Sequence, residues 1–181
     1  MLPEFRPFAK IPRLKRNIVV TEKIDGTNGN VHVGDDGTVI AGSRNRWISP
    51  AADDYGFAAW VQANEGELRK LGPGYHYGEW WGAGIQRRYG LQEKRYSLFN
   101  VERWSHPEAR PSCCSVVPVL YSGPYDTNAI EAVCDDLRKN GSKASPGFMN
   151  PEGIVVYQCS SRTLSKFTLD GDGHKESRDG E

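Results

Sequence analysis

The sequence is poor in cysteine and contains no long apolar run. The first shortage argues against a zinc-binding protein, and the second argues against a membrane-spanning one. Its 181 residues include four cysteines, none in a C-x-x-C pair, so a zinc site is not indicated. Free thiols are typical of a reducing cytoplasm, where we expect the protein to act. No apolar stretch approaches the ~20 residues that span a bilayer, and the charged, proline-rich start does not resemble a secretory signal. We therefore expect no membrane partner.

The common nucleotide-binding loops and a net charge are also missing. No G-x-G-x-x-G opens a helix and no G-x-x-x-x-G-K-[ST] occurs, so a nucleotide would be bound by other means. The 23 basic residues balance the 23 acidic ones, so nucleic-acid binding would need a local basic patch. An amino-terminal arm, residues 1–16, is either such a patch or a solvated arm. Its basic residues are Arg6, Lys10, Arg13, Lys15 and Arg16.

Short stretches rich in β-branched and aromatic residues predict strands. A hairpin turn is indicated at Asp35-Asp36-Gly37, in the middle of the second stretch. A polar, glycine-containing loop separates the third stretch from the fourth. The predicted strand regions are residues 17–24, 30–44, 75–81, 95–104, 116–121, 152–158 and 162–169.

Two segments switch to a helical period of apolar residues. Residues 53–72 form the first, with Asp53 or Asp54 as a candidate cap, and residues 126–141 form the second, with Asp126 as cap. In the second helix, the positions expected to face inward are Ile130, Val133 and Leu137.

Strands in groups with short connections favour an α+β fold, with mainly antiparallel sheets flanked by helices. We expect a single domain over residues 1–181, with a polar tail at 171–181.

The stretch "TEKIDGTNGN", at Thr21–Asn30, carries a pattern with chemical meaning. A free lysine has a pKa of about 10.4, so Lys23 would need desolvation or nearby cations to become a nucleophile. Asp25 follows on the same side of a strand that alternates with period two, and could hold a metal. Gly26 would let the backbone turn sharply beside a ligand. The alternative is an exposed lysine beside a turn aspartate.

Further along the chain, short motifs follow in a fixed order, and together they resemble the covalent nucleotidyltransferases. After "EKIDGTN" come "SRNR", "YGEWWG", "YSLFNV", "PEGIVVY" and "LSKFT". "EKIDGTN" is most similar to the phage-type double-strand RNA ligases, and the motifs cover Thr21 to about Lys175. The resemblance implies the nucleotidyltransferase (ATP-grasp-like) fold of ligases and capping enzymes, reduced to its catalytic core.

The resemblance also implies a role for each motif residue, with ATP and Mg²⁺ or Mn²⁺ as cofactors. Lys23 would attack the α-phosphorus of ATP, and Lys166 would neutralise charge on that phosphate. Metal ligation would come from three carboxylates, of which Glu79 could instead hold the ribose. The implied metal ligands are Asp25, Glu79 and Glu152; the implied nucleotide contacts are Glu22, Lys23, Asn28, Arg44, Glu79, Phe99, Glu152 and Lys166.

Each residue also has a plain structural interpretation. Phe99 in a strand could belong to the core, Lys166 could be a surface lysine on an edge strand, and Arg44 could pair with any surface acid. Glu79 and Glu152 could be ordinary strand carboxylates. The ordered occurrence of all the motifs favours the functional interpretation.

The sequence departs from the family pattern in two places. The last motif usually has two lysines one residue apart, but Leu164 and Thr168 flank Lys166 at that spacing. Lys175 or Arg162 could substitute. The chain also ends soon after this motif, where larger ligases continue into a further domain, so a partner subunit could supply the missing grip on nucleic acid.

These observations predict an ATP-dependent RNA ligase that joins 5′-phosphate and 3′-hydroxyl ends, or the strands of a nicked duplex, through lysyl-AMP. RNA contacts are expected from the basic arm and from Arg87 and Arg88. The compact core also suggests a phage-encoded enzyme that acts in the host cytoplasm. The alternatives are a DNA nick ligase, a capping guanylyltransferase and a non-catalytic protein that binds RNA ends.

Overall fold

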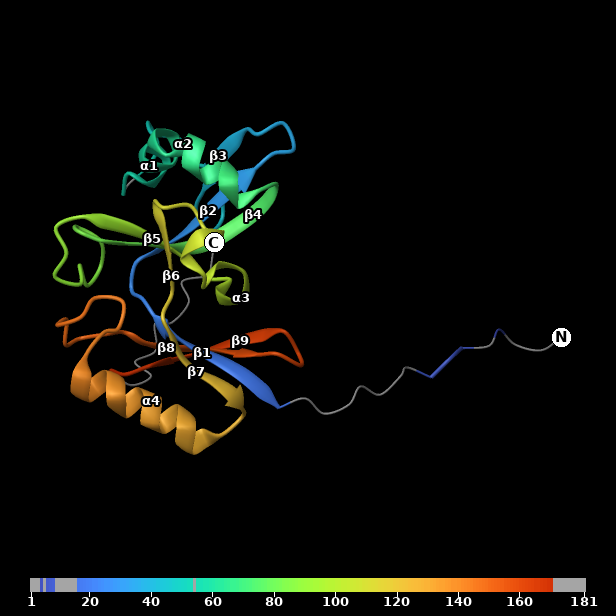
Figure 1. Ribbon diagram of the computed structural model, residues 1–181, viewed down its shortest axis with the longest axis vertical. Coiled ribbons are helices and arrows are strands. Elements are labelled where there is room, and N and C mark those ends of the chain that lie inside the picture. The colour runs from blue at the N-terminus through green and yellow to red at the C-terminus, as the bar shows by residue number, and fades with distance from the viewer. Residues whose placement is uncertain (1–3, 5, 9–15, 54, 171–181) are drawn as a thin grey trace, which may run out of the picture.

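The computed structural model describes residues 4, 6–8, 16–53 and 55–170. Several predictions lie outside these residues: most of the basic arm, the alternative cap Asp54, the substitute cation Lys175 and the polar tail. Within the described residues, two β-sheets form the body of the molecule, and helices flank them (Figure 1). None of the helices there has the length and apolar character needed to cross a membrane.

The first sheet has four strands in the order β7-β1-β8-β9. Every pairing within it is antiparallel, as the short connections predicted. The sheet joins segments from both ends of the chain, because β1 near the start lies between two strands that come much later. The strands are β1 (Asn17–Lys23), β7 (Val119–Pro124), β8 (Gly153–Gln158) and β9 (Thr163–Thr168).

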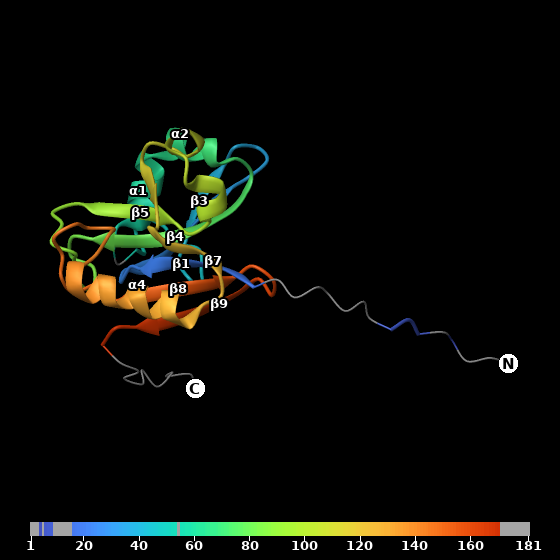
Figure 2. The same cartoon turned by 60° about the horizontal axis from the view of Figure 1, so that its bottom comes forward.

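Helix α4 (Thr127–Asn140) covers one face of this sheet (Figure 2). The Asp126 side chain accepts the amide N–H of Asn128 and so caps the helix, as predicted. Leu137 is fully buried, and the partly buried Ile130 and Val133 pack against the same apolar cluster. The sheet contributes Ile18, Val20, Ile154 and Val156.

The second sheet has five strands in the order β3-β2-β4-β5-β6. Only the β5–β6 pair is parallel among its pairings. The predicted hairpin joins β2 to β3, where the Gly34 amide donates to the Thr38 carbonyl oxygen. The strands are β2 (Thr27–Val33), β3 (Val39–Gly42), β4 (Gly74–Gly82), β5 (Lys94–Leu98) and β6 (Cys114–Val116).

The helix predicted over residues 53–72 is broken into three pieces. Asn64 ends the first piece with φ −110° and ψ 13°, outside the helical region. Its side chain bonds the Trp60 carbonyl oxygen, which competes with continued helix. The cap predicted at Asp53 was wrong in position, because Gly56 is the N-cap residue; the Asp53 carboxylate nevertheless accepts the Ala58 amide in the first turn. The pieces are α1 (Phe57–Ala63), α2 (Glu65–Leu68) and the 3-10 helix η1 (Arg69–Leu71).

Two strand predictions were wrong in extent. The strand predicted over 95–104 ends at Leu98, because Asn100 caps the short helix α3 (Val101–Trp104) by accepting the Arg103 amide. A 3-10 helix, η2 (Pro107–Ala109), follows. The strand predicted over 116–121 is divided between β6 and β7 at Pro118, which lacks the N–H that a ladder needs.

A small apolar cluster lies where the two sheets meet. Ile24, Trp81, Tyr89 and Val117 are buried in it. Ile24 follows β1 in the first sheet, and Trp81 belongs to β4 in the second. The cluster therefore holds together the two sheets at the point where the chain crosses from β1 to β2.

Candidate active site

Strand register places Lys23 beside Glu152. Lys23 pairs with Gly153 across the β1–β8 ladder, so Glu152 enters next to it. Lys23 Nζ lies 2.5 Å from Glu152 Oε2, and the two side chains are 23% and 14% exposed. The predicted nucleophile is thus largely sheltered and in contact with one of the predicted carboxylates.

Lys166 lies on the same face of the sheet as Lys23. Thr21, two residues before Lys23, pairs with Val155, which in turn pairs with Lys166. Directly paired residues project to one face, and positions two apart share that face. Lys166 is exposed on the edge strand β9. Arg162 lies in the turn before β9 with φ 58°, at the other end of the hairpin from Glu152.

Glu79 reaches the same place from the second sheet. One carboxylate oxygen accepts the Gly26 amide at 3.0 Å, and the other accepts the Asn28 side-chain amide at 3.3 Å. Burial raises the pKa of Glu79 to about 7, against the lowering effects of the Gly26 bond and the Lys23 charge; the Glu152 and Asp25 charges raise it further. Glu79 is therefore a half-buried carboxylate that exchanges its proton near neutral pH.

Gly26 allows this approach because a side chain would not fit there. A Cβ at this position would lie 2.4 Å from the Trp80 carbonyl oxygen and 2.7 Å from the Trp81 Cβ. These distances are below any ordinary contact, so the backbone of the β1–β2 crossing lies directly against β4. The glycine of "EKIDGTN" is required because the β1–β2 crossing packs closely against β4.

Asp25 is held by an arginine that the sequence assigned to RNA contact. Strand alternation does not place Asp25, as had been expected, because β1 ends at Lys23 and Asp25 lies beyond it. Arg87 Nε lies 3.1 Å from Asp25 Oδ2, and Arg87 Nη2 lies 2.6 Å from Asp170 Oδ2. Arg87 also donates to the backbone and side-chain oxygens of Asn150. A polar loop with two arginines was the only sequence signal for this contact.

The three predicted metal ligands have partners of their own in this structure. Glu152 contacts Lys23, Asp25 contacts Arg87, and Glu79 accepts from Gly26. Across the part of the chain that the structure describes, no group of three or more His, Cys, Asp or Glu side chains is arranged to hold a metal ion. Mg²⁺ commonly uses one or two carboxylates together with substrate phosphates and water. The donor set fits that mode, and the ligand assignment stays a prediction.

Glu22 faces away from Lys23, as alternation along β1 requires. It is 1% exposed, and its carboxylate accepts three hydrogen bonds. The donors are the Ser142 hydroxyl at 2.5 Å and the amides of Lys143 and Ala144 at 2.7 and 2.9 Å. Glu22 thus anchors the loop after α4, and the nucleotide contact predicted for it stays a prediction.

Phe99 and Arg44 are both accessible to a ligand. Phe99 follows β5 and is 40% exposed, so it is not a core residue. Its amide donates to the Tyr77 carbonyl oxygen at 2.9 Å, which fixes it beside β4. Arg44 is exposed in the loop after β3, and Arg88 is exposed beside Arg87.

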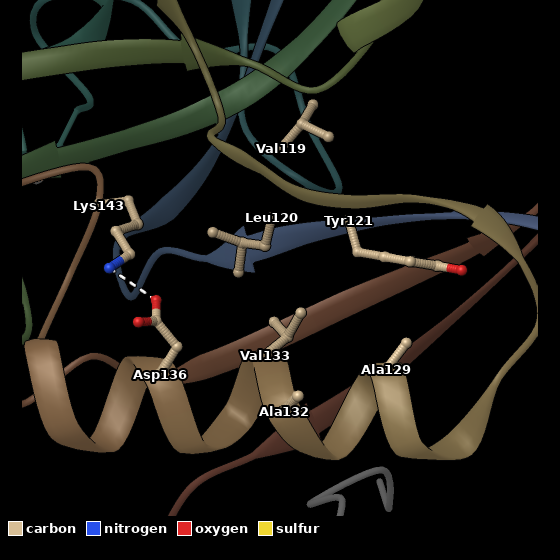
Figure 3. Close-up of a pocket in the computed structure, with 8 residues that line it drawn as sticks. All are labelled: Val119, Leu120, Tyr121, Ala129, Ala132, Val133, Asp136 and Lys143. Carbon is tan, nitrogen blue, oxygen red and sulfur yellow. Dashed lines mark ion pairs between the residues drawn. The ribbon is translucent and has the colours of Figure 1, made fainter.

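A pocket occurs elsewhere, in the region between β7 and α4 (Figure 3). An ion pair of 2.6 Å between Lys143 and Asp136 lies at one end of it. None of its lining residues is a predicted site residue. They are Val119, Leu120, Tyr121, Ala129, Ala132, Val133, Asp136 and Lys143.

One protein-family model matches most of the chain. The family model described as RNA ligase matches residues 16–170. The chain belongs to the RNA ligase family. The matched range includes every predicted site residue, from Glu22 to Lys166. No match was found among curated proteins.

Solved structures show the same fold at low identity. A variant of the Naegleria gruberi RNA ligase in its apo form superposes with a TM-score of 0.64 and 21% identity. The match covers 86% of the present chain and 51% of the Naegleria chain. Variants of the same enzyme with ATP and Mn, and with AMP and Mn, give TM-scores of 0.64 and 0.65 at 20% identity, with the same coverage. The chain therefore spans about half the length of the solved RNA ligases it matches.

Proposed function

We propose that the protein is an ATP-dependent RNA ligase that works through lysyl-AMP. The observation that carries the proposal is Lys23 in contact with Glu152, on the sheet face that also bears Lys166 and close to Glu79. A sheltered amine, an adjacent carboxylate and a second cation are the groups that adenylyl transfer to lysine needs.

The proposed reaction has three steps. Lys23 Nζ attacks the α-phosphorus of ATP, an N–P bond forms, and the P–O bond to pyrophosphate breaks. Glu152 Oε2, 2.5 Å from Nζ, is placed to hold a proton of the amine as it attacks. The AMP then passes to an RNA 5′-phosphate, which frees Lys23, and a 3′-hydroxyl attacks that phosphate and expels AMP.

The other site residues have supporting roles in this proposal. Asp25, Glu79 and Glu152 are the candidates to hold a divalent cation, which when bound supplies charge neutralisation on the phosphates. Lys166, on the sheet face of Lys23, would neutralise charge on the α-phosphate, and Arg44 would offer a planar fork for a phosphate or the ribose.

The remaining candidates contact the nucleoside or its surroundings. Phe99 is proposed to stack on the adenine, an assignment supported by its exposure. Asn28 already bonds Glu79 and could reach a nucleotide hydroxyl from there. Any nucleotide contact by Glu22 would compete with its three existing bonds.

Labelling with ATP tests the proposal. The protein is incubated with α-labelled ATP and Mg²⁺, and covalent label is counted after denaturation. We expect label on the wild type and none on Lys23→Ala. Lys139→Ala, an exposed lysine of α4, is the matched control and should keep full label. Wild type without label, or Lys23→Ala with it, would contradict the proposal.

A second candidate is a protein that binds RNA ends without joining them, favoured by the single lysine of the last motif. RNA binding without any lysyl-AMP would support it. A DNA nick ligase shares the first step with the main proposal and is separated by comparing nicked duplexes with an RNA or a DNA 3′-hydroxyl strand.

The partner and location belong to the proposal as well. A partner subunit that helps to bind RNA stays a prediction. A cytoplasmic site of action is supported by the four cysteines, which are all free. A phage origin stays a prediction from the motif resemblance.

A further inference from the structure

Beside the proposed site, one face of the five-stranded sheet carries a row of exposed aromatic side chains. Alternate residues of β4 share this face, so Tyr77 and Tyr75 follow Glu79 along it. With the rise of an extended strand, Tyr77 lies about 7 Å and Tyr75 about 14 Å from Glu79. The row therefore begins at the site and leads away from it.

Trp47 extends the row across the sheet. A backbone bridge links it to Gly42 at the end of β3, where a Cβ would lie 3.1 Å from the Trp47 ring. The ring is 6.2 Å from that of Tyr75, with 22° between their planes, and Tyr75 is 6.3 Å from Tyr77, with 11° between planes. His32 packs against Tyr75 at 4.5 Å. Contacts with the sheet and with one another thus fix the three rings in position.

These three rings, which we name the aromatic platform, are open to solvent. Trp47, Tyr75 and Tyr77 are 50%, 57% and 56% exposed. The loop that carries Trp47 also carries the exposed Arg44 and Arg46. Apolar faces beside cationic forks match the two parts of a nucleotide, which are the base and the phosphate.

We propose that the aromatic platform stacks unpaired bases of the RNA strand whose end is being joined. The inference rests on the proposed ligase function, because it concerns the same site's substrate. Every base has a π-face, so stacking tolerates any sequence, and arginines beside it can hold the backbone. Bases within a fully paired duplex are already stacked on one another. The platform therefore favours ends that carry unpaired nucleotides over a perfectly paired nick.

Binding measurements with two RNAs test this proposal. One RNA is a fully paired nicked duplex, and the other has unpaired nucleotides at the junction; each is titrated with protein and followed by fluorescence anisotropy. Loss of one stacked base should weaken binding by between about 5- and 150-fold. We expect that loss for Trp47→Ala and for Tyr75→Ala with the unpaired RNA, and little change with the paired one.

Conservative variants separate stacking from other effects. Trp47→Phe and Tyr75→Phe keep a ring and should bind nearly as the wild type does. Tyr125→Ala removes an exposed tyrosine after β7 and is the matched control. The alanine variants should leave the salt dependence of binding unchanged, because they remove no phosphate contact.

Three results would contradict stacking on the aromatic platform. The alanine variants could bind the unpaired RNA as tightly as the wild type does, or lose equal affinity for both RNAs. The third result is that the phenylalanine variants bind as weakly as the alanine variants. The first of these is also the result expected if a protein partner covers this face. Lysyl-AMP formation needs no RNA and is measured separately. Its absence in the wild type would remove the proposed ligase function while the binding result still decided the platform.

Discussion

At the scale of single residues, the three carboxylates of the site differ in their burial and in their charged partners. Glu79 is half-buried at the sheet junction, and this desolvation raises its pKa to about 7. Glu152 lies in direct contact with a lysine, and Asp25 with an arginine. Two of the three carboxylates are therefore neutralised by cations, while Glu79 is left to titrate in the pH range where the enzyme is proposed to work.

The raised pKa of Glu79 predicts a specific pH dependence of stability. An acid whose folded pKa exceeds its unfolded value, here 4.5, stabilises the fold below that value and loses this contribution as pH rises through the folded pKa. Relative to Glu79→Gln, the wild type should lose about 3 kcal/mol of unfolding free energy between pH 4.5 and 8. Chemical unfolding without ATP or metal measures it.

The matched control for this prediction is Glu131→Gln, an exposed glutamate of α4. Its difference from the wild type should stay flat over the same pH range. If the Glu79→Gln difference is also flat, then the pKa of Glu79 is not raised as described here.

Replacing Glu22 should lower the stability of the fold through lost hydrogen bonds. Glu22→Ala leaves the Ser142 hydroxyl and two backbone amides without their acceptor. Each lost partner costs about 1–3 kcal/mol, so we expect the unfolding free energy to fall by roughly 3 kcal/mol or more. Thermal unfolding measures this, and Glu4→Ala, an exposed glutamate, is the control. A Glu22→Ala protein with wild-type stability but weak ATP binding would instead support a direct nucleotide contact.

At the scale of elements, the β1–β2 crossing brings the two sheets together. Gly26 lies against β4, and its amide donates to Glu79. Gly26→Ala should push the crossing away from β4, because the new Cβ would meet the Trp80 carbonyl oxygen at 2.4 Å. We expect a loss of about 1–3 kcal/mol in stability and a larger fractional loss of lysyl-AMP formation, since Asp25 moves with the crossing, away from Glu79 on β4.

Thermal unfolding and ATP labelling of the same preparation check the Gly26 prediction. Gly66→Ala is a suitable control, because a Cβ there meets nothing within 4 Å. Unchanged labelling in Gly26→Ala would show that the crossing tolerates displacement.

At the scale of the whole molecule, Arg87 ties together segments that are far apart in the sequence. It extends from the loop after β4 to Asp25 between β1 and β2, to Asn150 before β8 and to Asp170 after β9. The guanidinium therefore links loops of both sheets around the site. Its fork makes several directed bonds at once, which a lysine cannot reproduce.

Arg87→Ala should loosen those loops without unfolding the molecule. Because the partners are partly exposed, we expect a modest loss of about 1–2 kcal/mol and faster hydrogen exchange at the amides of Phe148 and Leu169, which donate to the Ser145 and Glu152 carbonyl oxygens in the linked loops. Arg87→Lys should recover little of the protection, and Arg88→Ala, at the exposed neighbour, should behave as the wild type does. Exchange at these amides that matches the wild type in Arg87→Ala would contradict the linking role.

Much of this protein could be predicted from local pattern. The alternation of β-branched residues, the Asp35–Gly37 turn and the Asp126 cap are short-range features, and the sheets, hairpin and helix α4 followed from them. The boundaries that failed, at Asn64, Asn100 and Pro118, are places where one polar or cyclic residue overrides a longer pattern.

The sequence by itself determined which groups are available, and the order of its motifs determined the family. Tertiary structure decided which groups meet. Contact between Lys23 and Glu152 depends on strand register, and the link from Arg87 to Asp25 depends on a loop folding back across 62 positions. Such contacts depend on long-range packing between two sheets, for which no short stretch of residues carries a signal.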